Sequence, residues 1–445
     1  MKPVKQLLLA IALTGLCIAA DLEKQVDEYV GAFVEMGRFS GSILVAKGGK
    51  VLAAKGYGEA NLEHGVPNTP RTKFRLGSIT KQFTATAILQ LEQRGKLSLE
   101  DPVKKHLPGA PAAWDPVTVH HLLTHTSGIP TYTGLPGYMK TMFMPVTVYE
   151  MIAKFRDLPL EFQPGEKFQY DNSGYFLLGA IIEKVAGERY EDYLRKSIFE
   201  PLGMRDTGYD HFETILPNRA SGYTRDEGKV EHAAYLDMSQ PYSAGSLYST
   251  VEDLLIWDQA LYTEKLLPKT ALDRMFTPFK DNYAYGWMVD QAFNRKRIAH
   301  GGGINGFNTM ISRFPDDRVL VVVLSNTETG DTGRMARDLS AMVFGEKYEA
   351  PKERVEIKLD PARLDAFVGQ YELRPGFILT VTKEDNQLMT QATGQGKFQV
   401  FPESDTKFFL KVVDAQVEFV TEAQGRVTHL VLYQGGRETK AKKIE

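Results

Sequence analysis

Hydrophobic residues near the start of the chain follow a helical spacing first and an alternating one afterwards. Apolar positions recur every three or four residues between Leu22 and Met36, and the segments Ser42–Ala46 and Val51–Tyr57 then alternate. The turn sequence Lys47-Gly48-Gly49-Lys50 lies between the two alternating segments. The pattern predicts a helix that leads into a β-hairpin.

The middle of the chain has mostly helical patterns, and strand patterns return after it. Between about Ser78 and Leu261, helical patches such as Gly174–Val185 and Glu252–Leu261 are separated by Gly/Pro loops. Four later segments have the pattern of consecutive antiparallel strands, namely Tyr283–Val289, Arg297–His300, Met310–Phe314 and Val319–Leu324.

Strands at both ends of this region with helices between them predict an α+β fold. We expect one antiparallel sheet, assembled from the two ends of a domain that runs from residue 21 to residue 345, with helices packed on its faces. A charged, Pro-containing stretch, residues 346–361, follows and is a predicted linker.

The last part of the chain, residues 362–445, has short strand patterns at regular intervals with turn residues between them. This spacing predicts a small all-β barrel or sandwich. The predicted strands are Phe367–Leu373, Leu379–Lys383, Gln387–Gln391, Phe398–Phe401, Lys407–Val412, Val417–Val420 and Val427–Leu432.

The first twenty residues have the pattern of a signal peptide. Lys2 and Lys5 precede an apolar stretch, Leu7–Ala20, that ends in small residues and is shorter than a membrane-spanning helix. We therefore expect export to the periplasm or the medium, with no stable membrane insertion after cleavage. The single cysteine, Cys17, lies in this segment after Leu16, where a lipid-attachment motif would have a small residue. The mature chain then has no thiol for a disulfide, a nucleophile or a metal ligand.

Charge narrows the classes of partner. The formal net charge is −3 and no run of basic residues occurs. Nucleic acid is therefore an unsuitable partner, because binding its phosphates favours a concentrated Lys/Arg face. The expected partner is a small-molecule or peptide substrate, and the pattern says nothing about the oligomeric state.

The segment Ser78-Ile79-Thr80-Lys81 opens a predicted helix. Residues three apart share one helix face, and a desolvated lysine can take the proton of a serine hydroxyl. The N–H of Ser78 would also be free to stabilise an oxyanion. By itself the motif favours a helix-capping serine. A second copy, Ser404-Asp405-Thr406-Lys407, has no helix after it and is interpreted as a turn.

Two further segments carry candidate chemistry. In Tyr170-Asp171-Asn172 the tyrosine could act as a base beside the positive charge of Lys81, and the asparagine could hold a substrate amide. The alternative is a turn that caps the next helix.

In His300-Gly301-Gly302-Gly303, glycines at the end of a predicted strand would allow a substrate to approach closely, and the Gly303 N–H could bind an oxyanion. A β-bulge or turn is the structural alternative. The similar oxyanion loop of α/β-hydrolases requires a Gly-x-Ser-x-Gly motif, which this chain lacks.

No metal site is predicted. His121 and His125 are four residues apart and could share a helix face, but further ligands do not cluster near them.

The three motifs, in this order, resemble those of the serine β-lactamase and penicillin-binding-protein superfamily. Other segments resemble its class C branch, which includes carboxylesterases and D-amino-acid peptidases. The resemblance spans residues from about 25 to 330, and these segments are Phe74–Lys81, His121–Gly128, Pro201–Met204 and Ala244–Thr250. The C-terminal domain is similar to the lipocalin-like appendages of some peptidases in this branch.

This resemblance implies a β-lactamase-like fold and a hydrolase that needs no cofactor. Ser78 would be the acylated nucleophile, and Lys81 and Tyr170 the proton-transfer pair. Asn172 would position the substrate, and the N–H groups of Ser78 and Gly303 would form the oxyanion hole, with His300 and Gly302 beside them.

One departure from the β-lactamase pattern bears on the substrate. His300 stands where those enzymes usually have a lysine that helps to bind the substrate carboxylate, and a histidine is largely neutral at pH 7. This favours esterase or aminopeptidase-type activity over β-lactamase or D,D-carboxypeptidase activity. A D-amino-acid peptidase, a penicillin-binding D,D-peptidase and a non-catalytic peptidoglycan- or ligand-binding protein stay open as alternatives. Asp171 is expected to point away from Lys81, because its charge would favour the protonated lysine.

Overall fold

The structure, a computed structural model, describes residues 21–226, 229–352, 354–374, 376–411, 415–422, 426–434 and 437–444. The predicted signal peptide lies outside these residues. The chain divides into two compact units, Met1–Glu349 and Ala350–Glu445. Among the described residues, no helix is both long and apolar enough to cross a lipid bilayer.

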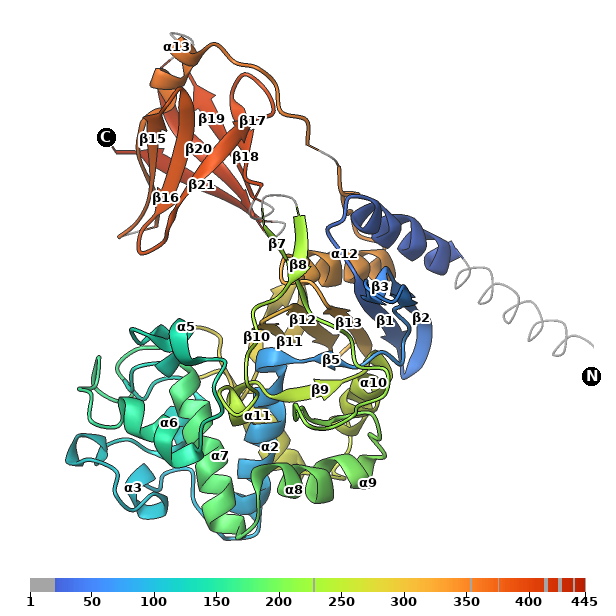
Figure 1. The fold of residues 1–445 in the computed structure, drawn as a ribbon, viewed down its shortest axis with the longest axis vertical. Coiled ribbons are helices and arrows are strands. Elements are labelled where there is room, and N and C mark those ends of the chain that lie inside the picture. The colour runs from blue at the N-terminus through green and yellow to red at the C-terminus, as the bar shows by residue number, and fades with distance from the viewer. Residues whose placement is uncertain are drawn as a thin grey trace, which may run out of the picture. The chain divides into compact units, whose positions relative to one another are not determined.

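A six-stranded antiparallel sheet organises the first unit (Figure 1). Strand β1 pairs with β13 from Gly41 opposite Ser325 to Lys47 opposite Val319, so the sheet is assembled from the two ends of the unit as predicted. In spatial order the strands are β10 (Met288–Ala292), β11 (Arg295–Ile304), β12 (Phe307–Phe314), β13 (Val319–Ser325), β1 (Gly41–Lys47) and β2 (Lys50–Tyr57).

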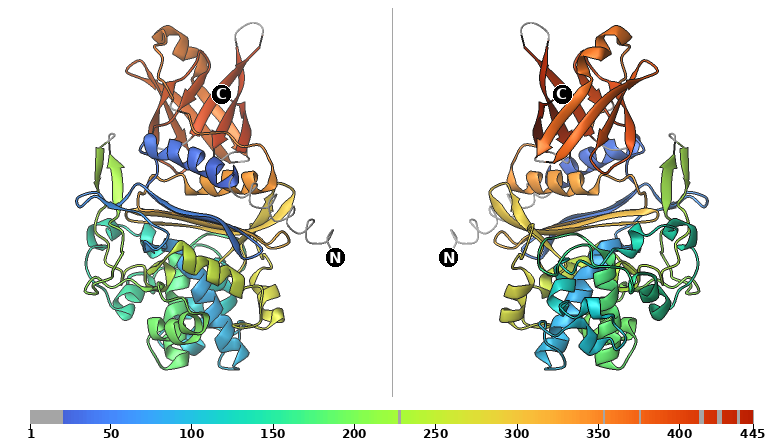
Figure 2. Two further views of the ribbon diagram at one scale, coloured as in Figure 1. Left: turned by 90° about the vertical axis from the view of Figure 1, so that its right-hand side faces the viewer. Right: turned by 90° about the vertical axis from the view of Figure 1, so that its left-hand side faces the viewer.

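Helices cover both faces of this sheet (Figure 2). Successive residues of a strand point to opposite faces, so Ile43 and Val45 pack on one side of β1 and Leu44 on the other. The first face is covered by the helix at residues 21–35 and by α12 (Thr332–Phe344). The second face packs against the helical part of the unit, which includes α2 (Thr80–Gln93) and α10 (Val251–Ala260).

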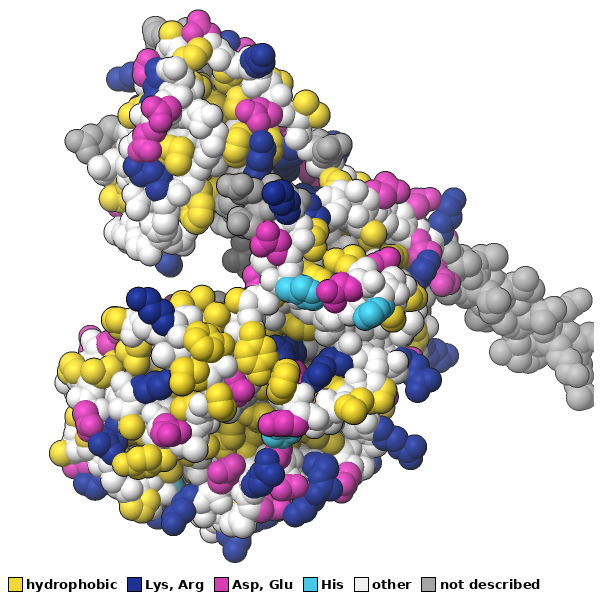
Figure 3. All heavy atoms as spheres, viewed as in Figure 1, with side chains coloured by type: hydrophobic (Ala, Val, Ile, Leu, Met, Phe, Trp, Pro, Cys, Tyr) yellow, Lys and Arg dark blue, Asp and Glu magenta, His cyan; other side chains and the backbone are white. Residues whose placement is uncertain are grey.

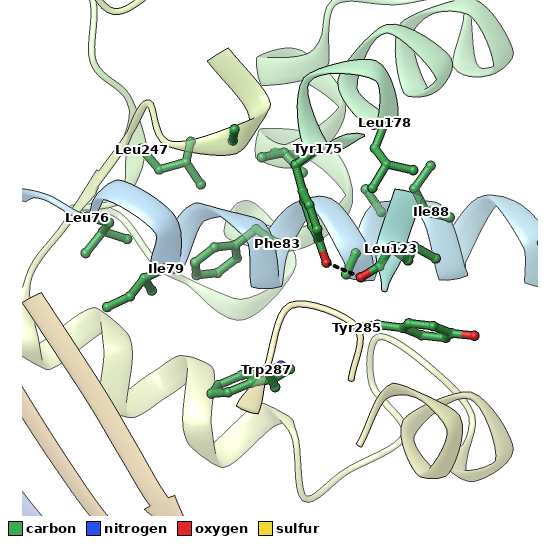
Figure 4. Close-up of a cluster of buried hydrophobic side chains, with 14 of the residues drawn as sticks. Leu76, Ile79, Phe83, Ile88, Leu123, Tyr175, Leu178, Leu247, Tyr285 and Trp287 are labelled. Atoms are coloured by element: carbon green, nitrogen blue, oxygen red, sulfur yellow. Dashed lines mark hydrogen bonds between the residues drawn. The ribbon is translucent and has the colours of Figure 1, made fainter. Parts of the chain in front are cut away.

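Helix α2 runs through the centre of this helical part. Its residues from Thr80 to Leu91 are all buried, so other parts of the unit pack against it on every side. Figure 4 shows Phe83 and Ile88 of α2 among side chains from several other segments. The remaining α-helices of the unit are α3 (Val103–His106), α4 (Val119–Leu123), α5 (Tyr138–Thr141), α6 (Val148–Phe155), α7 (Asn172–Ala186), α8 (Tyr190–Leu194), α9 (Glu200–Leu202) and α11 (Lys269–Met275).

The first of the four predicted late strands begins too early in the prediction. Tyr283–Val289 was expected to be a strand, but β10 begins only at Met288, and the preceding residues form turns around Gly286 at a φ of 76°. Left-handed backbone of this kind ends a regular strand.

Small sheets of two or three short strands complete the unit: β3 (Glu59–Asn61) with β4 (Val66–Pro67), β5 (Phe74–Arg75) and β6 (Gly208–Tyr209) on either side of β9 (Leu247–Ser249), and β7 (Tyr223–Asp226) with β8 (Lys229–His232).

The second unit is a closed antiparallel barrel, one of the two architectures predicted for it. Consecutive strands pair in chain order, and β14 pairs with β21 to close the barrel, with Tyr371 opposite Lys443. Its interior is filled by side chains such as Phe408 and Phe419. The strands are β14 (Gly369–Arg374), β15 (Phe377–Glu384), β16 (Gln387–Ala392), β17 (Lys397–Pro402), β18 (Lys407–Phe409), β19 (Ala415–Thr421), β20 (Val427–Gln434) and β21 (Arg437–Lys443), preceded by α13 (Pro361–Leu364).

The closing strand β21 was not predicted from the sequence. Its residues, Arg437 to Lys443, are charged or polar except for Ala441, which is fully buried. A single small apolar residue produces no alternating pattern, so pairing with β14 and β20 rather than local hydrophobicity defines this strand. The predicted strand end at Val412 lies outside the described residues.

Candidate active site

Ser78 lies in a turn that leads directly into α2. The turn is a 3₁₀-helix, Gly77–Ile79, and neither it nor α2 has a side-chain hydrogen bond at its N-cap. The capping interpretation of Ser78 is therefore wrong. The residue is half-buried, and its hydroxyl is left to interact with side chains instead of the helix backbone.

Lys81 is completely buried in the first turn of α2. Its Nζ donates to three oxygens: Ser78 Oγ at 3.0 Å, Asn172 Oδ1 at 2.9 Å and the carbonyl of Ala244 at 2.9 Å. Burial lowers the pKa of Lys81 to about 7, although the charge of Asp171 acts in the opposite direction. An amine with this pKa is present in both protonation states near neutral pH, which suits proton transfer.

Tyr170 approaches the same serine and lysine from the loop before α7. Lys81 Nζ lies 4.9 Å from the centroid of its ring. Although 37 % of the residue is exposed, desolvation raises the pKa of its phenol, and a hydrogen bond with Ser78 offsets this only in part. The phenol is therefore neutral at pH 7, and the part that Tyr170 plays in proton transfer stays a prediction.

Asn172, the first residue of α7, is oriented by two threonines. Its side-chain amide donates to Thr133 Oγ1 at 3.2 Å, and its backbone N–H donates to Thr131 Oγ1 at 3.1 Å. These contacts turn the carbonyl oxygen of Asn172 toward Lys81. The sequence offered no signal for either threonine.

The glycine triplet lies inside β11, not at a bulge or turn beyond its end. Its pairing with β12 is unbroken from His300 opposite Ile311 to Gly303 opposite Asn308, so the strand continues past the predicted end at His300. A β-carbon on Gly302 would lie 1.9 Å from the carbonyl oxygen of Leu76, and one on Gly77 would lie 3.1 Å from the backbone nitrogen of Gly303. The glycines therefore let β11 lie directly against the turn that carries Ser78.

His300 is buried and neutral. Its Nδ1–H donates to the carbonyl of Gly301 at 2.6 Å, and its Nε2 accepts from the Tyr283 hydroxyl at 3.1 Å. Burial and the nearby charge of Lys81 lower its pKa to about 3. The ring centroid of His300 lies 6.2 Å from that of Tyr170. The glycine-rich motif therefore lies beside the motifs that contain Tyr170 and Ser78.

Asp171 is buried rather than solvated. Its side chain caps α7 by accepting from the Gly174 N–H and makes no hydrogen bond with Lys81, in agreement with the expectation that it points away. Its charge nevertheless raises the pKa of Lys81.

The two histidines considered for a metal have separate roles. His121 Nδ1 accepts from the Thr118 N–H in a capping box, whereas His125 is buried beside Asp171. Among the residues that the structure describes, no three His, Cys, Asp or Glu side chains group closely enough to hold a metal ion. The second Ser-x-x-Lys segment is a turn between β17 and β18, where the Lys407 N–H donates to Ser404 Oγ.

Comparison with known proteins agrees with this geometry. The family described as Beta-lactamase matches residues 22–343, and a domain of unknown function, DUF3471, matches residues 353–443. Penicillin-binding protein 4* of Bacillus subtilis is 33 % identical over 438 residues, which cover 92 % of this chain and 95 % of that protein.

Two solved structures are similar as well. The octameric penicillin-binding protein homologue from Pyrococcus abyssi is 30 % identical with a TM-score of 0.69, and the match covers 95 % of this chain and 99 % of that one. A D-stereospecific amidohydrolase from Streptomyces is 27 % identical with a TM-score of 0.62, over 73 % of this chain and 99 % of that one. This chain therefore belongs to the Beta-lactamase family of serine hydrolases and penicillin-binding proteins.

Proposed function

We propose that this chain is an exported hydrolase that cleaves ester or amide bonds through an acyl-enzyme on Ser78. The observation that carries the proposal is the contact between Lys81 Nζ and Ser78 Oγ at 3.0 Å, together with burial that brings the pKa of Lys81 to about 7. A serine hydroxyl becomes a nucleophile when a neighbouring base takes its proton.

The proposed reaction has two steps. Neutral Lys81 takes the hydroxyl proton of Ser78 while Oγ bonds to the substrate carbonyl carbon, and the N–H groups of Ser78 and Gly303 stabilise the resulting oxyanion. The bond to the leaving group then breaks, and the leaving group receives the proton from Lys81 through the neutral Tyr170 hydroxyl. Water hydrolyses the acyl-enzyme by the same proton transfers and restores the serine.

The state of His300 supports substrates without a carboxylate beside the scissile bond. Its Nδ1–H is used by Gly301 and its pKa is about 3, so it offers neither a charge nor a free N–H at Nδ1 to a carboxylate. Esters and amides, including D-amino-acid amides, are therefore favoured over penicillins and D,D-peptides. The likeness to a D-stereospecific amidohydrolase supports the amide alternative.

An apolar surface adjoins the site and supports substrates with apolar groups. Tyr132, next to Thr133, packs against Tyr138 at 5.6 Å between ring centroids, and Asn305, two residues after Gly303, donates to Met142 Sδ. The segment from Tyr138 to Met144, which includes both contacts, exposes Met139, Phe143 and Met144 by 68 %, 50 % and 52 %. Figure 3 shows apolar side chains gathered on the surface around α5.

Intact-protein mass spectrometry with parallel product detection tests the proposal. The mature protein is incubated with p-nitrophenyl acetate, a longer p-nitrophenyl ester, a D-alanyl p-nitroanilide and a chromogenic cephalosporin. We expect turnover of an ester or the anilide, and loss of turnover and adduct in Ser78→Ala. Absence of both with all four substrates would favour a non-catalytic binding protein, and faster turnover of the cephalosporin would restore the β-lactamase alternative.

A further inference from the structure

Asp171 is a buried carboxylate that the reaction proposed above does not use. It is 3 % exposed and stands between Tyr170 and Asn172, both of which contact Lys81. Its Oδ1 accepts from the Gly174 N–H at 2.5 Å at the start of the fifteen-residue helix α7. A β-carbon on residue 174 would lie 3.2 Å from both carboxylate oxygens, so the glycine leaves room for this charge. The helix N-terminus stabilises a negative charge at this position.

His125 fixes the other side of Asp171. Its Nδ1 accepts from the Asp171 N–H at 3.2 Å and lies 3.6 Å from the carboxylate oxygen Oδ2. The ring of His125 is fully buried and packs on that of Tyr170 at 4.2 Å between centroids. Its backbone has a φ of 55°, which non-glycine residues rarely adopt. This conformation costs free energy and persists only where the surrounding structure enforces it.

His125 does not neutralise Asp171. Burial lowers the pKa of the imidazole despite the adjacent carboxylate, so the ring is neutral at pH 7. Because Nδ1 accepts from the Asp171 backbone, the ring proton lies on Nε2, which has no hydrogen-bond partner among the described residues. Asp171 and Lys81 are thus two buried groups of opposite charge, and the charge of Asp171 raises the pKa of Lys81.

We propose that Asp171 is a positioning residue that acts through Lys81: its buried carboxylate is the counter-charge that keeps the lysine basic enough to take the proton of Ser78. His125 holds this carboxylate and the ring of Tyr170 in one arrangement. The inference rests on the proposed function, because it assigns a role within that proton transfer.

The direction of the effect follows from the two opposing influences on Lys81. Burial alone would lower its pKa further, and a weaker base takes a proton less effectively at neutral pH. Asp171 offsets part of that shift. Other titratable side chains face Lys81 and Asp171 from the elements packed against them, and all are neutral at pH 7. They are Tyr170, Tyr175, His125, Tyr283 and His300.

Asp171→Asn is the decisive variant, because asparagine can still cap α7 but carries no charge. The rate of Ser78 acylation by a p-nitrophenyl ester is measured from pH 5 to 10. We expect the acidic limb of the profile to move to lower pH by about one unit and the rate on the plateau to fall, since Lys81 becomes a weaker base. Asp171→Ser, also a capping residue without charge, should give the same shift, and the exposed control Asp273→Asn should give none.

The outcomes separate the two proposals. If the wild-type chain acylates Ser78 and its acidic limb stays in place in Asp171→Asn and Asp171→Ser, Asp171 is only a helix cap and the inference fails. If the wild-type chain itself forms no acyl-enzyme, the proposed function fails first. If circular dichroism shows that Asp171→Asn does not fold, the acylation profile of Asp171→Ser decides between the same outcomes.

Discussion

Gly302→Ala is expected to displace the turn that carries Ser78. The new β-carbon would lie 1.9 Å from the carbonyl oxygen of Leu76 and 2.4 Å from Thr309 Oγ1, which itself donates to that carbonyl at 2.8 Å. Carbon and oxygen atoms that are not bonded need roughly 3 Å or more between them, so the backbone at Leu76 must retreat by about 1 Å. Leu76 is two residues before Ser78, and the displacement reaches the nucleophile.

The size of the effect follows from this clash. Overpacking of this kind costs about 1–3 kcal/mol of stability. A misplacement of about 1 Å at a reacting group lowers the rate of reaction about 100-fold. The neighbouring substitution Gly301→Ala is a matched control, because its β-carbon would meet Thr309 O at 3.5 Å and Met310 Sδ at 3.7 Å, which are ordinary contacts.

Thermal unfolding and the rate of ester hydrolysis measure both effects. We expect Gly302→Ala to lower Tm by about 2–4 °C for each kcal/mol lost and to hydrolyse the ester about 100-fold more slowly. Gly301→Ala should stay close to the wild-type chain in both measurements. Equal Tm and equal rates for the two variants would refute the close approach of β11 to the Ser78 turn.

Three further predictions concern other parts of the molecule. The kcat/KM for an ester should rise with pH through about 7 and then level off, because Lys81 must lose its proton to act as a base, and a profile flat from pH 5 to 9 would contradict this. Asp258→Ala should lower the free energy of unfolding by about 3–5 kcal/mol in a chemical unfolding experiment, because buried Arg313 loses its carboxylate partner. The control Asp273→Ala, in the exposed pair with Lys269, should lower it by less than about 0.5 kcal/mol. Phe419→Ala should destabilise the barrel by about 3–5 kcal/mol, seen as faster proteolysis of residues 350–445, and the half-exposed Phe398→Ala should not.

Local patterns in the sequence were sufficient for the features that lie within a few residues of each other. Ser78 and Lys81 are three residues apart at the start of a helix, so one helical turn brings them together whatever the rest of the chain does. The short strand patterns at residues 42–46 and 319–324 likewise predicted strands at both ends of the first domain. The order of the three motifs predicted the family, because motif order is a property of the chain itself.

The tertiary structure decided what depends on residues distant in sequence. The three acceptors of Lys81 come from Ser78, Asn172 and Ala244, and its pKa is set by burial that only the packed core provides. Burial also raises the pKa of the Tyr170 phenol, a shift that no local pattern predicts.

The glycine triplet and the barrel also have features that depend on residues distant in sequence. Gly302 is needed because a carbonyl more than two hundred residues earlier lies against it, and no local pattern records that approach. Strand β21 exists because β14 and β20 offer it backbone partners, although its side chains are polar. Sequence patterns encode spacing and local preference, whereas desolvation and close contact between distant segments are properties of the folded chain.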